Sequence, residues 1–398
     1  MSTLGGVGMG KQADSYQTGR TAAQEALREM GDGCPDFVLV FTTEAFDQEQ
    51  VLTGIRSLTG EAPMLGCCGG GVITEQGLSQ DSVAVMALKS DDLRVILGLG
   101  EAISQDARRA AEMVAEEVLA KQPEDAGDYQ ATFLMLPDGL TGANLADLVR
   151  GAADTLGPMC QLVGGGAGDN VKFIKTYQFI NGEIHTDAVS VALILSKVPV
   201  GVGVQHGWSA VGRPLIVTNA EGKIVKELDG RPAFESYLQQ FGKRYPELAI
   251  ETFAEFAMER PLGLPQMKGE YIIRDPLRAL PDGSLLCVAA VPQNAVVRIM
   301  SGDKESLFAA AKQAAEQSVK SLGGRKPALV IIFDCISRLL LLGEDAQREI
   351  EVIRSVIGRD IPLIGLFSFG EIAAQESNPP AFHNKTVAVC TIAQGEVH

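Results

Sequence analysis

The sequence predicts an α/β protein with three βαβ-type repeat units, whose helices flank mostly parallel or mixed sheets, plus an antiparallel α+β insert before the third unit. Three observations predict this fold. One ordered pattern of strands and helices occurs three times, a segment of different character separates the second copy from the third, and the composition is that of a chain with a large core. The 398 residues are 46% hydrophobic and 21% charged, which excludes wholesale disorder and allows two or three domains.

Each copy begins with the same four elements. A short apolar run opens it, at residues 6–9, 94–99 and 295–300. An Ala- and Glu-rich stretch of helical period follows, at 16–30, 105–119 and 304–322. A continuous apolar run typical of a buried strand comes next, at 37–41, 132–136 and 329–333, and then a second helical stretch, at 47–58, 142–156 and 345–357.

Each copy also closes in the same way. A proline precedes a hydrophobic–Gly step, at Pro63 and Gly66, Pro158 and Gly164, and Pro362 and Gly365. After a Gly-containing loop comes an alternating strand, at 82–86, 188–192 and 386–390. The order strand, helix, strand, helix, strand predicts parallel pairing, with helices on the faces of the sheets.

The copies are unevenly spaced, which predicts the domain organisation. We expect an N-terminal domain over 1–199, containing units 5–89 and 93–196, and a C-terminal domain over 200–398. The second domain would comprise an antiparallel insert, 200–294, and the third unit, 295–395. Within the insert we expect a hairpin of strands 214–218 and 223–228, a helix from Pro232 to about residue 241, and strands at 271–274 and 284–289.

Charge and cysteine content narrow the classes of function. Fifty acidic residues against 34 basic ones give a net charge of −16, which disfavours nucleic acid and anionic membrane surfaces as partners. Seven cysteines without framework spacing indicate reduced thiols. There is no apolar stretch of membrane-spanning length and no apolar signal segment at the start. We therefore expect a cytoplasmic protein that binds small molecules or other proteins.

An ordered set of residues in the insert and the third unit resembles the FIST sensory domain family. The set comprises His206, Gly207 and Trp208, then Val217, Thr218, Gly222, residues 227–233, residues 261–263 and residues 282–284, and finally Cys335, Arg338, Gly365, residues 370–372 and residues 382–384. The resemblance implies an FIST N and an FIST C domain in a signal-transduction protein that binds a small polar ligand, an amino acid or other carboxylate. The third unit ends close to His398, so we expect signalling through a separate partner, such as a histidine kinase.

The loops of the third unit hold the candidate ligand-binding residues, because ligands bind beyond the carboxyl ends of strands in α/β sheets. The candidates are Cys335, Arg338, Gly370, Glu371, Phe382, His383 and Asn384. Arg338 could hold a carboxylate in a bidentate manner and Glu371 could accept from an ammonium group. The alternatives are that Arg338 and Glu371 pair with each other or are solvated, and that Asn384 caps a turn. The Gly-rich loops at 67–71 and 164–166 either present N–H groups to an anion or are simple turns.

Two other functions stay open. Some stand-alone FIST relatives are haem-binding nitric oxide sensors, and His206, beside Trp208, is the candidate axial ligand. A hydrogen-bonded structural histidine is the alternative, and the residues themselves predict no cofactor and no metal site. A cysteine-dependent enzyme would need Cys335 as its nucleophile, with His383 as its base. No third orienting residue accompanies this pair, so we expect a receptor without catalytic activity.

Overall fold

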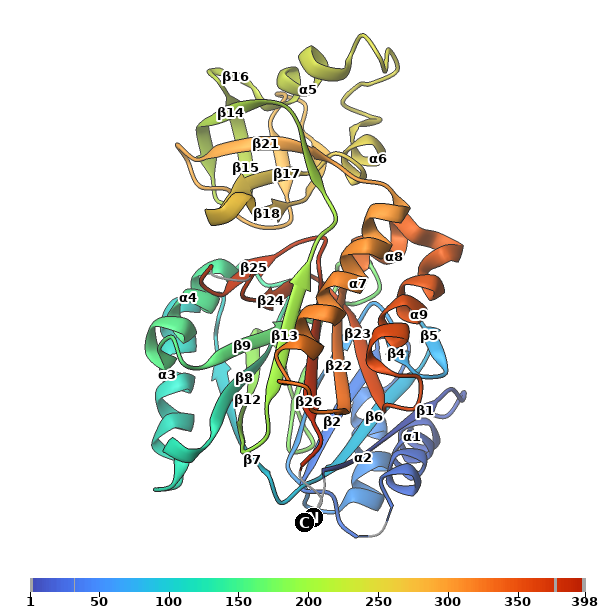
Figure 1. Cartoon of the computed structure of the whole chain (residues 1–398). Coiled ribbons are helices and arrows are strands. Elements are labelled where there is room, and N and C mark those ends of the chain that lie inside the picture. The colour runs from blue at the N-terminus through green and yellow to red at the C-terminus, as the bar shows by residue number, and fades with distance from the viewer. Residues whose placement is uncertain (1–2, 32, 376–377, 396–398) are drawn as a thin grey trace.

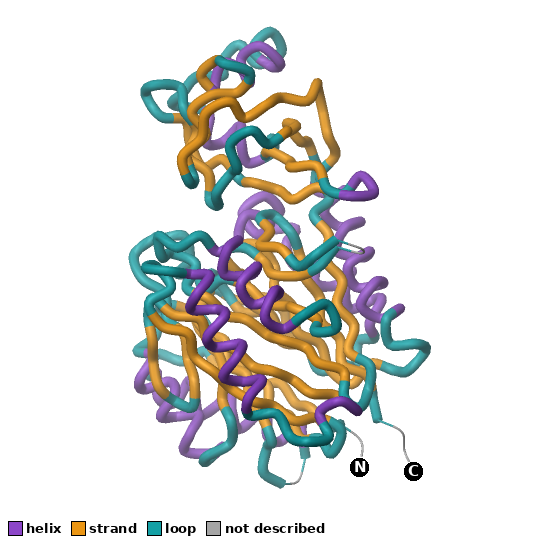
Figure 2. The backbone as a smooth tube through the Cα atoms, turned by 90° about the vertical axis from the view of Figure 1, so that its left-hand side faces the viewer, coloured by secondary structure: helices purple, strands orange, loops and turns teal. Residues whose placement is uncertain are grey.

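A computed structural model describes residues 3–31, 33–375 and 378–395 of the chain. Three repeat units form a body, and an antiparallel insert stands on one end of it (Figure 1). The view turned by 90° shows the same separation into body and insert (Figure 2). No helix among the described residues is both long enough and apolar enough to cross a membrane.

The first unit contains the predicted strands and helices in the predicted order. Its elements are β1 (Leu4–Gly10), α1 (Ser15–Met30), β2 (Phe37–Thr43), α2 (Gln48–Thr59), β3 (Met64–Gly69), β4 (Val72–Thr74), β5 (Gly77–Ser79) and β6 (Val83–Lys89). The second unit repeats them as β7 (Leu93–Glu101), α3 (Ala107–Ala120), β8 (Gln130–Pro137), α4 (Leu145–Leu156), β9 (Gln161–Gly165), β10 (Gln178–Ile180), β11 (Glu183–His185) and β12 (Ala188–Ser196).

The third unit is interrupted after its first strand. It consists of β13 (Val200–Gln205), α7 (Lys304–Lys320), β22 (Pro327–Cys335), α8 (Ile336–Leu342), α9 (Ala346–Ile357), β23 (Leu363–Ser368), β24 (Glu371–Ala373), β25 (Ala381–His383) and β26 (Val387–Ala393). The insert, residues 206–303, consists of β14 (Ser209–Glu221), β15 (Ile224–Leu228), β16 (Arg231–Pro232), α5 (Ala233–Phe241), α6 (Phe253–Met258), β17 (Leu262–Pro265), β18 (Tyr271–Arg274), β19 (Pro276–Ala279), β20 (Leu285–Cys287) and β21 (Val296–Ser301). Short 3-10 turns lie at Ala126–Asp128, Met267–Gly269 and Gly343–Asp345.

The three units form a closed ring by exchanging hairpins. In each sheet the unit's own strands run in the order first, last, second, third, as in β1-β6-β2-β3. A hairpin from another unit then extends the sheet. Hairpin β10–β11 of the second unit joins β3, hairpin β24–β25 of the third unit joins β9, and hairpin β4–β5 of the first unit joins β23.

The sheets are mixed, which is one of the two predicted arrangements, and the simple parallel pairing expected from the order of strands and helices is wrong. One pair in each unit is parallel, namely β2–β3, β8–β9 and β22–β23. The other named pairs of the described sheets are antiparallel, because the last strand of each unit returns between the first and second strands. The hairpin between the third and last strands reverses the chain and causes this antiparallel return.

The first strand of the third unit also differs from the prediction. Strand β21, expected to open that unit, pairs with β14 and β17 in the insert sheet. The opening strand is β13, which pairs with β26. The insert therefore lies between the first strand and the first helix of the third unit. The hairpin β14–β15 and the helix that follows Pro232 form as predicted.

A row of glycines explains why β13 occupies this place. Gly201 and Gly203 face helix α7 so closely that a Cβ on either would overlap the carbonyl oxygen of Ser318 or Ala314. In the first unit, Gly6 and Gly8 of β1 make the same approach to helix α1. The alternating Gly of β13 is therefore the sequence signal for a first strand beneath its helix, and β21 lacks it.

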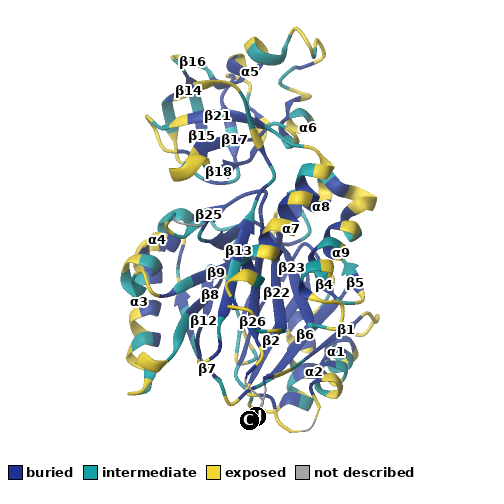
Figure 3. Ribbon diagram, in the orientation of Figure 1, coloured by how far each residue is buried: buried dark blue, intermediate teal, exposed yellow. Residues whose placement is uncertain are grey.

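One central core joins the three sheets. The buried cluster includes Phe41 of β2, Leu134 of β8 and Phe333 of β22. The rings of Phe41 and Phe333 pack edge to face, with their centroids 5.9 Å apart. Helices α1 and α2, α3 and α4, and α7 to α9 cover the outer faces of the three sheets. The strands are buried along most of their length and the helices expose their outer sides (Figure 3). The insert has a separate core around Tyr237 and Phe253.

The glycine row gives a first prediction. Gly203→Ala should destabilise the protein by about 1–3 kcal/mol, because a methyl group there has no space without moving α7 from β13. Gly142→Ala is the matched control, since no atom lies within 4 Å of a Cβ built at Gly142. Thermal melting of both variants checks this, and equal melting temperatures would contradict the close helix–strand contact.

Candidate functional site at the junction of insert and body

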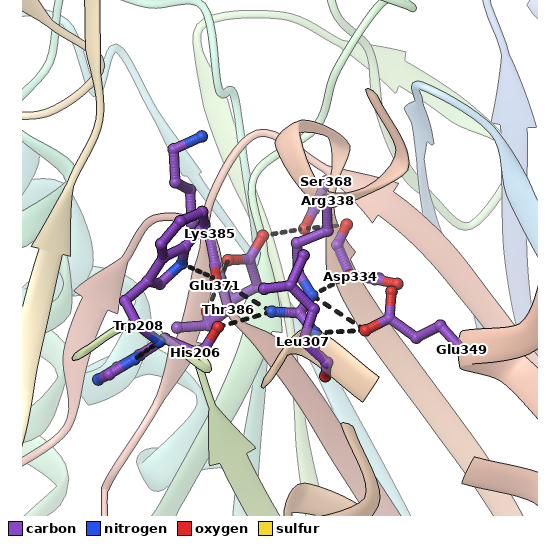
Figure 4. A network of polar contacts seen from close by, with 10 residues as sticks. All are labelled: His206, Trp208, Leu307, Asp334, Arg338, Glu349, Ser368, Glu371, Lys385 and Thr386. Atoms are coloured by element: carbon purple, nitrogen blue, oxygen red, sulfur yellow. Dashed lines mark hydrogen bonds and ion pairs between the residues drawn. The ribbon is translucent and has the colours of Figure 1, made fainter. Parts of the chain in front are cut away.

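The structure brings the predicted ligand-binding residues of the third unit together below the insert. Cys335 and Arg338 lie at the end of β22 and the start of α8, while Glu371 and His383 face each other across the β24–β25 pair. Figure 4 shows the polar network around Arg338 and Glu371. All seven residues are buried, so in this conformation they lie inside the protein.

Arg338 is the centre of this network, and protein groups occupy its donors. Its guanidinium forms ion pairs with Glu349 and, at 3.3 Å, with Asp334. It also donates to the backbone carbonyls of Leu307, His206 and Lys385. Two carboxylates of the chain therefore hold the position that we predicted for a ligand carboxylate. Among the described residues Arg338 pairs with these two acids rather than with Glu371.

Glu371 is a hydrogen-bond acceptor inside the body. Its carboxylate accepts from Ser368 Oγ at 2.8 Å, from the Thr386 backbone N–H at 3.1 Å and from Thr386 Oγ1 at 2.6 Å. Burial raises the pKa of Glu371 to about 7, although these hydrogen bonds lower it. The carboxyl group thus fastens β24 to the start of β26.

The remaining predicted residues pack the exchanged hairpin. Gly370 has a φ of 108°, and a Cβ there would overlap the ring of Phe382. His383 Nε2 lies 3.1 Å from the Ala373 carbonyl, and Asn384 Nδ2 donates to the His383 carbonyl. These contacts stabilise the β24–β25 hairpin on the sheet of the second unit.

The Gly-rich loops meet at the centre of the ring and bond to one another. Gly70 N–H donates to the Phe367 carbonyl, Gly166 N–H to the Gly370 carbonyl and Gly168 N–H to the Cys68 carbonyl. Each bond joins two different units. The backbone N–H groups of the Gly-rich loops therefore link the repeats. The sequence leaves open whether these loops bind an anion or form simple turns.

His206 does not suit axial ligation of haem in this conformation. Its Nδ1 accepts the backbone N–H of Trp208 at 2.8 Å, which places the ring proton of the neutral imidazole on Nε2. A ligating histidine instead keeps its proton on the nitrogen that faces away from the metal. Burial, with smaller contributions from His383 and Arg338, lowers the pKa of His206 to about 3, so the ring is neutral.

The surroundings of Cys335 do not activate its thiol as a nucleophile. Burial, followed by the negative charge of Glu371, raises the pKa of its thiol well above the usual value. Nucleophilic cysteines have a lowered pKa and a cationic neighbour at close range. His383 directs Nε2 to a backbone carbonyl, and burial lowers the pKa of this imidazole to about 4.

The sequence reasoning missed a buried ion pair between the body and the insert. Lys385, in the turn before β26, places Nζ 3.2 Å from Asp275 Oδ2, and Ser337 Oγ donates to the same oxygen at 2.9 Å. The neighbouring insert residue, Arg274, donates to the Phe382 carbonyl at 3.1 Å. We call these contacts the seam. Lys385 directly follows the predicted Asn384, but no sequence signal links it to Asp275, which is 110 positions earlier.

A small hollow lies beside the seam. It has a volume of about 10 Å³ where Asn144 of the second unit, Lys223 and Ala289 of the insert, and Phe369 and Phe382 of the third unit meet, and Phe382 is the seam residue that borders it. This volume accommodates one water molecule at most. A wider groove of about 1150 Å³ lies between α4 and α7, bordered by Asp154 and Lys320, and contains none of the predicted residues.

The Arg338 network predicts a large effect on stability. Arg338→Leu should lower the free energy of unfolding by about 3–5 kcal/mol, because it leaves two buried carboxyl groups without their partner. Arg150→Leu, which breaks the exposed pair with Asp147, should cost at most about 1 kcal/mol. Chemical denaturation measures both, and similar losses would show that the network is not a stabilising centre.

The buried imidazoles and Glu371 predict opposite pH effects. Between pH 6.5 and about 4 the unfolded chain protonates His383 while the native protein does not, so stability falls as the pH falls. Between pH 7 and about 4.5 native Glu371 binds the proton more tightly than the unfolded chain, so its contribution rises as the pH falls.

We therefore expect His383→Gln to flatten the loss of stability on acidification and Glu371→Gln to steepen it, each by up to about 1.4 kcal/mol per pH unit. Denaturation curves of the wild type and both variants from pH 4 to pH 7 measure these slopes. Slopes that change in the same direction in both variants would contradict the assignment.

Comparison with known proteins identifies the family. The FIST N domain model matches residues 36–231 and the FIST C domain model matches residues 233–374. An uncharacterized protein of Methanocaldococcus jannaschii is 23% identical over 83% of this chain, and the match spans 65% of that protein, slightly under two thirds. An uncharacterized protein of Mycobacterium tuberculosis is 24% identical over 95% of this chain and 96% of its own length.

Among solved structures, a cyanuric acid hydrolase from A. caulinodans aligns with 98% of this chain and 99% of its own, at 9% identity and a TM-score of 0.35. A likeness of this size carries no argument about the present chain. The two domain models together match most of its length. The protein belongs to the FIST family.

Proposed function

We propose that this protein is a sensor that binds a small polar ligand, an amino acid or another carboxylate, at the seam between the insert and the body. Occupancy would then be passed to a separate signalling partner, such as a histidine kinase. Family membership supports the sensory role. The single observation that carries the site is the Lys385 ammonium group, which is fully buried and has no hydrogen-bond acceptor among the described residues.

A buried ammonium group is costly without directed partners. Removing it from water costs several kcal/mol, and an ion pair offsets this only when hydrogen bonds satisfy the remaining protons. The contact with Asp275 is close enough for ion pairing, but Nζ forms no hydrogen bond with a described residue. Such a group at the meeting point of two structural parts is a candidate binding group, since ligand sites favour these junctions.

We assign to Lys385 the carboxylate-binding role that the sequence predicted for Arg338. Arg338 directs its donors into the body, whereas the Lys385 side chain extends past the indole of Trp208 and away from the network (Figure 4). The ammonium nitrogen lies 5.5 Å from the centre of that indole ring. Lys385 would contact the ligand carboxylate, and the aromatic side would provide an apolar wall.

The closed seam determines how the ligand would act. Because Lys385 and Asp275 are buried and lie 3.2 Å apart, a ligand carboxylate would reach Lys385 only when the insert moves relative to the body. The chain crosses between the two parts twice, from β13 to β14 and from β21 to α7 (Figure 1). A ligand that binds the more open arrangement would shift the population towards it, and the partner would recognise that change.

Ligand screening tests this function. Among amino acids and small organic acids, at least one should raise the melting temperature of the wild type, with about 2.7 kcal/mol of stabilisation at 100 times its dissociation constant. Lys385→Met should abolish this response, whereas Lys320→Met, in the groove between α4 and α7, should keep it. Titration calorimetry of the hit measures the same difference. Absence of any response, in protein shown by mass spectrometry to carry no co-purified ligand, would refute the proposal.

A further inference from the structure

We infer that Lys385 and Ser337 form a carboxylate-binding subsite and that Asp275 of the insert is its tethered occupant. The inference rests on the proposed function and defines its ligand subsite. A ligand carboxylate would have to displace the side chain of Asp275. The insert therefore acts as an internal competitor that keeps the sensor closed in the absence of ligand.

The geometry places both body groups on one oxygen of the insert. Asp275 Oδ2 receives the Ser337 hydroxyl at 2.9 Å and lies 3.2 Å from Lys385 Nζ. Ser337 comes from the first turn of α8, and Lys385 comes from the turn between β25 and β26. A hydroxyl donor and an ammonium group that converge on one carboxylate oxygen are the groups that would bind a free carboxylate.

Burial shows that this contact is an enclosed one. Lys385 is 0% exposed and Asp275 is 4% exposed. Lys385 has a left-handed backbone, with φ of 57°, which a lysine adopts only at an energetic cost. The surrounding structure thus holds a strained lysine in a closed position, as is typical of functional sites.

The second unit provides an internal comparison. At the corresponding turn before its last strand it has Asp187, which is also left-handed, with φ of 51°. Asp187 is half-exposed and accepts hydrogen bonds from Ser104 and Thr141 of its own unit. The third unit, which carries the insert, has a cation at this turn instead, and the insert supplies the opposite charge.

Arg274 explains how displacement of Asp275 would be transmitted. Its guanidinium donates to the carbonyls of Ala290 and Ile273 within the insert and to that of Phe382 in the exchanged hairpin. Asp275 directly follows Arg274, the last residue of β18, so release of its carboxylate would loosen both polar contacts of this segment with the body. Ligand binding and opening of the insert would then be one event.

Chemical rescue tests the subsite without knowledge of the natural ligand. Asp275→Ala leaves the subsite empty and should lower the melting temperature. Sodium formate, compared with sodium chloride at equal ionic strength, should raise the melting temperature of this variant saturably, by about 2–4 °C, while that of the wild type stays unchanged. The double variant Asp275→Ala/Lys385→Met should show no response. Asp282→Ala, which removes an exposed carboxylate of the same insert, is the matched control.

The outcomes separate this inference from the proposed function. A formate response in Asp275→Ala that persists without Lys385 would overturn the subsite, as would no response at all. If Asp275→Ala does not fold, Asp275→Ser, whose side chain is also too short to fill the subsite, gives the same comparison with and without Lys385→Met. Formate rescue without any ligand hit in the wild type would support the subsite and refute the sensor. A ligand hit without rescue would do the opposite.

Discussion

The ring of exchanged hairpins is the constraint on which the rest of this structure depends. Each unit completes the sheet of a neighbour, so within the described residues none of the three sheets of the body has its full set of strands without another unit. The loops at the centre must then approach closely, which only glycine permits, and their N–H groups are used between units. Because the core is shared by three sheets, the units are expected to fold as one body and to hold their loops rigidly.

Two buried cations of the third unit, Arg338 and Lys385, lie within this rigid frame and differ in their partners. Arg338 connects α7, α8, α9 and the turns before β14 and β26, because its donors reach groups from all of them. A cation with several well-directed acceptors can be buried at little net cost, so it acts as a structural centre. Lys385 is equally buried, but among the described residues it forms an ion pair with one carboxylate, that of Asp275. The difference between the two cations separates a structural group from a candidate binding group.

The position of the insert gives this difference a functional meaning. An insert between the first strand and first helix of a unit has both ends fixed on the body, so it can move as a part without disrupting the ring. The seam itself is polar, and beside it Ile273 and Met300 of the insert pack into the apolar cluster of α7 to α9. Movement of the insert would therefore separate these apolar contacts as well as the polar contacts of the seam. The proposed sensor would combine a rigid frame with a movable part.

The sequence by itself determined the repeat architecture, the insert and the family. Periodicity and glycine spacing are local properties of the sequence. The family residues from His206 to Asn384 are recognised from their order along the chain. The sequence also indicated the right region for the polar network. Only the tertiary structure decided that β13, rather than β21, opens the third unit, that Arg338 pairs with Glu349 and Asp334, and that Lys385 meets Asp275. These are pairings between residues distant in the chain, and the physical reason is that partner choice depends on which loops the hairpin exchange brings together in space.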